Sequence, residues 1–230
     1  MTAPRRSRAA AASHPGSATV LALLVLSLLA GCRIPRPRPD ATIAILTPGA
    51  GELGVSTEYG IVFLGCGQQG GTVRFDAWFG GDPSREEGLV EAVGGGLYVT
   101  EAEIRLPTMP ITFAVPAPGE EVVIVGRRGA ERWRAPAVVA VHPAVTGLLL
   151  QMGEGMASFD DSQRGAGVYV ARREGLVLLG LVAGTVSLPA ADGGVARYLA
   201  VVGPEEMWRV ATHARNRSRD RRWVYRDDVL

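Results

Sequence analysis

The chain has 230 residues, of which 47% are hydrophobic and 20% charged, and its formal net charge at pH 7 is +1. A balance so close to zero excludes a general electrostatic attraction to nucleic acid. The length and the apolar content are sufficient for one large or two small domains with a real core.

The N-terminal segment predicts export from the cytoplasm. Its first eight residues contain three arginines, and an apolar run follows from Val20 to Ala30. This run has the length of the hydrophobic region of a signal peptide and is too short to remain as a membrane-spanning helix. We therefore expect an extracytoplasmic protein.

The apolar run ends in Leu29-Ala30-Gly31-Cys32, which resembles the signal of bacterial lipoproteins. The resemblance implies that residues 1–31 are removed and that Cys32 is acylated, so that several acyl chains hold the protein on a membrane. The alternative is a chance match beside an ordinary signal peptide. By analogy with lipoprotein sorting, Arg33 favours the outer membrane where the organism has one, and otherwise the cell membrane. With Cys32 acylated, Cys66 has no partner for an intramolecular disulfide.

Residues 32–40 alternate proline and arginine, which predicts an extended tether between membrane and domain. From residue 41 onward the chain consists of short β-branched or aromatic runs bounded by glycine or proline, which are typical of strands. The expected strands are residues 42–46, 59–64, 72–79, 111–115, 121–126, 137–141, 147–152, 168–172, 176–184 and 197–202. Without long helices between them, they predict an all-β barrel or sandwich.

One helix is expected near the C-terminus, over residues 204–214. Pro204 suits the first turn, two glutamates follow it, and an apolar stripe continues through Met207, Val210, Ala211 and Ala214. Residues 215–230 then form an arginine-rich tail. This tail is either a solvated end or a contact with an anionic surface, to which Trp223 and Tyr225 would add anchoring.

We expect no metal and no cofactor. His142 and His213 stand far apart without neighbouring ligands, and adjacent carboxylates on strands or turns point apart. Residues 65–70 spell G-x-G-x-x-G, but an expected strand follows instead of the helix that a dinucleotide site requires. We interpret this motif as a glycine-rich turn.

Four segments resemble bacterial trypsin-like serine proteases. In that family a Gly-Asp-Ser-Gly-type turn carries the nucleophile and is followed by a charged hairpin and by Leu-Val-Gly-Ile-Val-Gly; here residues 165–184 read GAGVYVARREGLVLLGLVAG. Residues 115–128 resemble the strand that opens the second barrel, residues 101–113 the strand with the catalytic aspartate, and residues 60–80 the strands that end in Thr-Ala-Ala-His. Order and spacing agree over roughly residues 55–214.

The resemblance implies a trypsin-like domain over residues 41–214. It would contain barrels at about 41–114 and 115–202, followed in sequence by the helix at 204–214. The alternative is a β-sandwich, as in an envelope structural lipoprotein unrelated to proteases.

The same alignment places Trp78 at the histidine position, Thr100 at the aspartate position and Gly165 at the serine position. An indole cannot accept the proton, and glycine has no oxygen, so a working triad is not expected. A shifted register offers Ser162, after Asp161, as a nucleophile, but supplies no base.

These residues predict a pseudoprotease that serves as a non-catalytic binding or scaffold module; an active hydrolase that uses Ser162 is the alternative. We expect its partners to be the membrane, through Cys32, and an envelope protein or peptide, but not nucleic acid. The glycine- and charge-rich residues 80–96 and 153–167 are the expected contact loops.

Overall fold

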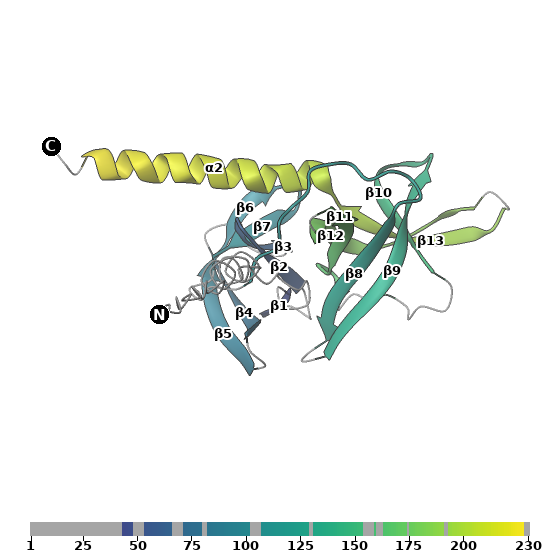
Figure 1. The fold of residues 1–230 in the computed structure, drawn as a ribbon, viewed down its shortest axis with the longest axis horizontal. Coiled ribbons are helices and arrows are strands. Elements are labelled where there is room, and N and C mark those ends of the chain that lie inside the picture. The colour runs from purple at the N-terminus through teal and green to yellow at the C-terminus, as the bar shows by residue number, and fades with distance from the viewer. Residues whose placement is uncertain are drawn as a thin grey trace, which may run out of the picture. The chain divides into compact units, whose positions relative to one another are not determined.

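The protein is represented by a computed structural model (Figure 1). It describes residues 43–47, 53–65, 71–79, 82–101, 107–128, 131–153, 159, 163–173, 175–190 and 193–227. All of these belong to one unit, Pro37–Leu230. The expected signal sequence and the tether, including Cys32, lie outside the described residues, as do Cys66 and Ser162.

The N-terminal strands form a single antiparallel sheet of seven strands in the order β5-β4-β1-β2-β3-β7-β6. Most neighbours in the sheet are joined by short hairpins, so the register follows from the local turns. β4 covers the predicted residues 72–79, with Phe75 buried, Val73 half-buried and Arg74 exposed, as its alternation predicts. The strands are β1 (Ile43–Thr47), β2 (Leu53–Thr57), β3 (Gly60–Leu64), β4 (Thr72–Phe79), β5 (Asp82–Leu89), β6 (Glu91–Gly94) and β7 (Leu97–Thr100).

The C-terminal strands close into a six-stranded antiparallel barrel in the order β10-β13-β12-β11-β8-β9. The expected strands at residues 121–126, 137–141, 147–152, 168–172, 176–184 and 197–202 all fall within it. A closed barrel pairs every strand on both sides and leaves no free edge. The strands are β8 (Glu121–Arg128), β9 (Glu131–His142), β10 (Val145–Met152), β11 (Gly167–Arg172), β12 (Gly175–Pro189) and β13 (Val195–Val202).

The strand expected at residues 111–115 is wrong, because this segment connects the sheet to the barrel. The Met109 amide donates to the Ser56 carbonyl at 2.9 Å, while Leu178 of β12 exchanges hydrogen bonds with Pro110 and Thr112. Parallel bridges pair Met109 with Thr57 and Ile111 with Leu178. Prolines in the segment lack the amide that a regular ladder needs, so it makes single bridges to two different sheets.

Residues 80–96 are mostly strands and not the loop that their composition predicts, while their role as a contact surface stays a prediction. β5 and β6 occupy most of this range, and Val90 between them is buried. The described part of residues 153–167 also differs from an exposed loop, since Phe159, Gln163 and residues 165–167 are buried. Exposed residues lie between these buried ones, among them residues 94–96 in the first segment and Arg164 in the second.

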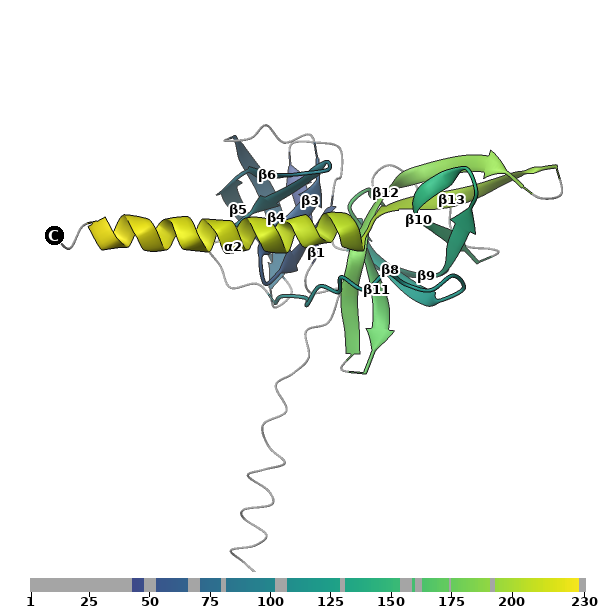
Figure 2. The same cartoon turned by 90° about the horizontal axis from the view of Figure 1, so that it is seen from above.

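The C-terminal helix α2 (Pro204–Asp227) extends well beyond the expected end at residue 214. The Glu206 carboxylate accepts from the Gly203 amide at 3.3 Å and so caps the start of the helix. Residues 215–227 contain neither glycine nor proline and are rich in arginine, a good helix former, so nothing ends the helix earlier. Met207, Val210 and Ala211 are buried as predicted. Figures 1 and 2 show α2 lying along β6 and β7.

Candidate functional site

The position that the protease alignment assigns to the nucleophile is a buried turn. Gly165 has φ +83°, and its amide donates to the Val182 carbonyl at 2.8 Å. The Leu53 amide, at the start of β2, donates to the Arg164 carbonyl at 2.9 Å. This turn before β11 is therefore joined by hydrogen bonds to the N-terminal sheet on one side and to β12 on the other.

No side chain fits at Gly165. A Cβ atom built on its backbone would lie 2.0 Å from the Leu53 carbonyl oxygen and 2.8 Å from its carbonyl carbon. Such contacts are far inside van der Waals distance, and the positive φ adds strain for any residue other than glycine. A seryl hydroxyl cannot be presented from this position without movement of β2 or of the turn.

Thr100, at the expected aspartate position, is 1% exposed at the end of β7. Its hydroxyl has no hydrogen-bond partner among the described residues, and it lies against the backbone of Gly88 in β5, where a built Cβ would be 2.1 Å from Oγ1. The sequence pattern predicts a position facing a catalytic centre, but the structure places this side chain in packing between β7 and β5.

Trp78 and Thr100 are not brought together. Gly88, the neighbour of Thr100, pairs with Val73 of β4, whereas Trp78 pairs with Pro83 five positions further along the same hairpin. At roughly 3.3 Å per residue, the backbone of Trp78 lies about 16 Å along β4 from Val73, the residue opposite Gly88. A triad requires its histidine and aspartate within hydrogen-bond distance.

The two histidines of the expected mature chain are held in structural contacts. Nδ1 of His142 accepts from the Ala144 amide at 3.2 Å, so Nε2 carries the proton and donates to the Pro189 carbonyl at 2.9 Å. His213 is hydrogen-bonded to Glu91 at 2.6 Å. With α2 extended to Asp227, His213 lies near mid-helix, and its partner is β6 and not the helix end.

Glu91 is the centre of the ionic contacts between α2 and β6. In addition to His213, it accepts from Arg217 at 2.9 Å, and Arg217 also pairs with Glu101. Burial alone would raise the pKa of Glu91, but the hydrogen bonds from His213 and Arg217 outweigh it and hold the pKa below its usual range. The carboxylate therefore joins α2 to β6, beside the buried apolar contacts of Met207, Val210 and Ala211.

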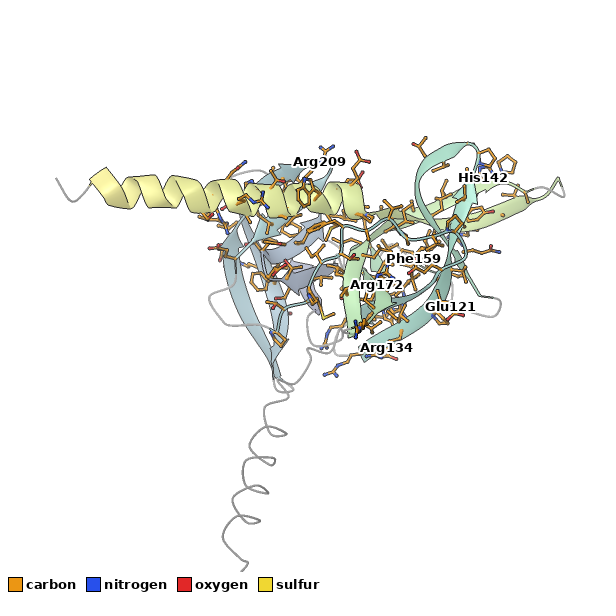
Figure 3. The ribbon with its side chains drawn as sticks, turned by 45° about the horizontal axis from the view of Figure 1, so that its top comes forward. Glu121, Arg134, His142, Phe159, Arg172 and Arg209 are labelled. Carbon is orange, nitrogen blue, oxygen red and sulfur yellow. The ribbon has the colours of Figure 1, made fainter. Side chains whose placement is uncertain are left out.

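A pocket of about 240 Å³ opens at one end of the C-terminal barrel. Figure 3 labels two of its residues, Arg134 on β9 and Phe159 before β11. Residues 131–135 place a tryptophan between two arginines, and they lie before the expected strand at residues 137–141, although β9 includes them. The pocket is lined by Arg128, Glu131, Trp133, Arg134, Ala135, Met152, Phe159 and Gln163.

Within the described residues, no group of three or more His, Cys, Asp or Glu side chains is arranged to hold a metal ion. In the same part of the chain, no helix has the length and apolar character needed to cross a bilayer.

No protein-family model and no curated protein matches the chain. The chain is similar to several solved structures. The inactive form of the Rv3671c protease aligns at 14% identity with a TM-score of 0.52, over 76% of this chain and 89% of that one. A serine endoprotease from Yersinia pestis aligns at 16% identity with a TM-score of 0.50, over 78% of this chain and 64% of that one. An inactive serine-to-alanine mutant of Rv3671c from M. tuberculosis H37Rv aligns at 13% identity with a TM-score of 0.54. The alignment covers 76% of this chain and 87% of that one.

The fold is of the trypsin-like double β-barrel type, with the seven-stranded N-terminal sheet and the closed C-terminal barrel as its two halves. This confirms the all-β class with a C-terminal helix, and the β-sandwich alternative is wrong. At these identities the similarity shows the fold alone. The chemistry must be argued from this chain's own residues.

Proposed function

We propose that the protein is a lipid-anchored, extracytoplasmic module whose trypsin-like domain binds a partner without cleaving it. One observation carries this proposal: Gly165, in the turn that the sequence resemblance assigns to the nucleophile, has its Cα against the Leu53 backbone with no room for a side chain. A fold that keeps its barrel and closes its nucleophile position is suited to binding or scaffolding.

The contacts of the two histidines and of Thr100 support the same proposal. Both ring nitrogens of His142 are engaged with backbone groups, and His213 is paired with Glu91 on α2. Thr100 is buried against Gly88. Loss of triad function costs on the order of a millionfold in rate, so a domain without base and nucleophile has no useful protease activity.

The second candidate function is a serine hydrolase that uses Ser162, which the shifted register places after Asp161. Purified full-length protein should not be labelled by a fluorophosphonate probe, because both histidines of the expected mature chain are engaged in other contacts. The Ser162→Ala variant is the matched control, and an active trypsin-like protease confirms that the probe works. Labelling that disappears in Ser162→Ala would overturn the non-catalytic proposal.

Membrane attachment is a separate part of the proposal and rests on the signal that ends in Cys32. Replacement of Cys32 by serine removes the acylated sulfur, so we expect the protein to move from the membrane to the soluble fraction in cell fractionation. The matched control is Cys66→Ser, which should leave the distribution unchanged. Membrane association of Cys32→Ser that persists at low salt but is lost at high salt would assign the attachment to the arginines of residues 215–227 instead.

A further inference from the structure

The later turns of α2 extend past the strands on which its first turns pack (Figures 1 and 2). The buried side chains of Met207, Val210 and Ala211 all lie in the first third of the helix. Over residues 212–218 no side chain is buried. This part of the helix is therefore accessible to a partner.

One face of α2 carries a continuous row of arginines. A helix turns by about 100° per residue, so positions spaced alternately by three and four residues fall on one line. Arg217 lies on the opposite side, where it pairs with Glu91 and Glu101. Asp220 and Asp227 lie about 100–120° round the helix from the row. The row, which we call the arginine stripe, consists of Trp208, Thr212, Arg215, Arg219, Arg222 and Arg226.

The spacing of the four arginines concentrates positive charge along the helix. From Arg215 to Arg226 the stripe is about 16 Å long, and it contains no acidic residue. Like charges three and four residues apart are neighbours on a helix and destabilise it by repulsion. A flat anionic surface along the stripe would relieve this repulsion, because it places a counter-charge beside every arginine.

The stripe begins with an exposed aromatic residue. Trp208 is 48% exposed, and its ring packs edge-on against Phe113, with 5.0 Å between the ring centroids. The guanidinium carbon of Arg215 lies 6.0 Å from the centroid of the same indole. Tryptophan and arginine both combine an apolar body with a polar tip, which suits them to the boundary between lipid headgroups and acyl chains.

We propose that the arginine stripe lies on the anionic phospholipid headgroups of the membrane that holds the acylated Cys32. The inference deepens the membrane attachment proposed above and rests on it for the choice of a lipid surface over an acidic protein. Ile43, the first residue of β1, is eleven positions after Cys32, and at about 3.3–3.6 Å per residue this segment spans at most about 40 Å. α2 alone is about 36 Å long, so the tether keeps the domain within reach of the membrane.

The stripe orients the domain and does not replace the lipid anchor. Four arginines attract a protein to a lipid surface weakly, because salt screens each contact. Once the acyl chains hold the domain at the membrane, the second contact forms at a high effective concentration, and a weak attraction is sufficient. This agrees with the expected release of Cys32→Ser from the membrane.

The test places a fluorophore on the stripe in the acylated protein. Thr212→Cys in a Cys66→Ser background is labelled with a thiol-reactive nitrobenzoxadiazole, and the protein is reconstituted into vesicles with a nitroxide on the lipid headgroup. Thr146→Cys, also at an exposed threonine but on β10, is the matched control. In vesicles with roughly 30% phosphatidylglycerol, we expect quenching of the Thr212 probe at least about twice that of the Thr146 probe. The difference should disappear in neutral vesicles or at about 1 M salt.

Two double variants that remove the same charge separate the stripe from net charge. Arg219→Gln with Arg222→Gln takes two cations from the stripe and should abolish the excess quenching. Arg209→Gln with Arg221→Gln takes two cations from other faces of α2 and should preserve it.

Three results would overturn the proposal in different ways. A Thr212 probe quenched no more than the Thr146 probe in anionic vesicles would leave the stripe to an acidic partner protein, while flotation with neutral vesicles would still support the lipid anchor. Equal losses in both double variants would assign the attraction to net charge. Failure to float with vesicles of either composition would overturn the lipid anchor as well.

Discussion

Replacement of Gly165 by serine is expected to lower the free energy of unfolding by about 2–5 kcal/mol and to produce no hydrolase activity. Two separate effects destabilise the folded state. A residue with a side chain is strained at φ +83°. Its Cβ would also overlap the carbonyl oxygen of Leu53, which is fixed by the pairing of β2 with β1. Urea denaturation measures the stability, and the fluorophosphonate probe measures the activity.

Two other glycines separate the costs. Gly193 has φ +84° and no atom within 4 Å of a built Cβ, so Gly193→Ala carries only the backbone strain, about 1–2 kcal/mol. Gly147 has open space and no positive φ, and its replacement by alanine should be close to neutral. If Gly165→Ala cost no more than Gly193→Ala, the turn would not be packed against β2, and the case for a closed nucleophile position would fail.

The stretch at residues 165–184 shows how far the sequence determines this fold. Apolar runs bounded by glycine predicted β11 and β12 and, by resemblance, the barrel that contains them. The same residues could not show what faces Gly165, because that contact comes from Leu53, more than a hundred positions earlier. Long-range packing of this kind leaves no periodic pattern in either segment.

Two strands of unusual composition, β2 and β5, were not predicted from the sequence. β2 reads LGVST and is buried throughout, so it lacks the alternation that marks a half-exposed strand. β5 reads DPSREEGL, and its proline and charges are typical of a loop, yet it occupies one edge of the sheet. Edge strands tolerate such residues because one side of their backbone is unpaired.

The pocket at the end of the C-terminal barrel was missed for a related reason. Its residues come from β8, β9, β10 and the segment before β11, and only closure of the barrel brings them together. The resemblance assigns Trp78 and Thr100 to two triad positions, whereas the strand register sets their backbones apart.

The introduction of an aspartate at Thr100, the residue that a triad would need there, is expected to destabilise the protein by about 3–5 kcal/mol at neutral pH. The position is 1% exposed, and the Thr100 hydroxyl already has no partner among the described residues, so a carboxylate would be an unpaired buried charge. Thr100→Val removes the unpaired hydroxyl with little change in shape and should remain within about 1 kcal/mol of the wild type.

The pH dependence tests whether the charge itself is the cause, with Thr100→Asn as the uncharged control of similar size. Burial would raise the pKa of the introduced carboxyl above its unfolded value of about 3.9, so the folded state would hold the proton more tightly. The penalty is then small below the unfolded pKa and grows as pH rises towards the folded pKa. The difference between Thr100→Asp and Thr100→Asn should shrink from about pH 7.5 to about pH 4.5. An aspartate variant as stable as the wild type at neutral pH would mean that a hydrogen-bond donor or a cation faces this position and would return Thr100 to the candidate site.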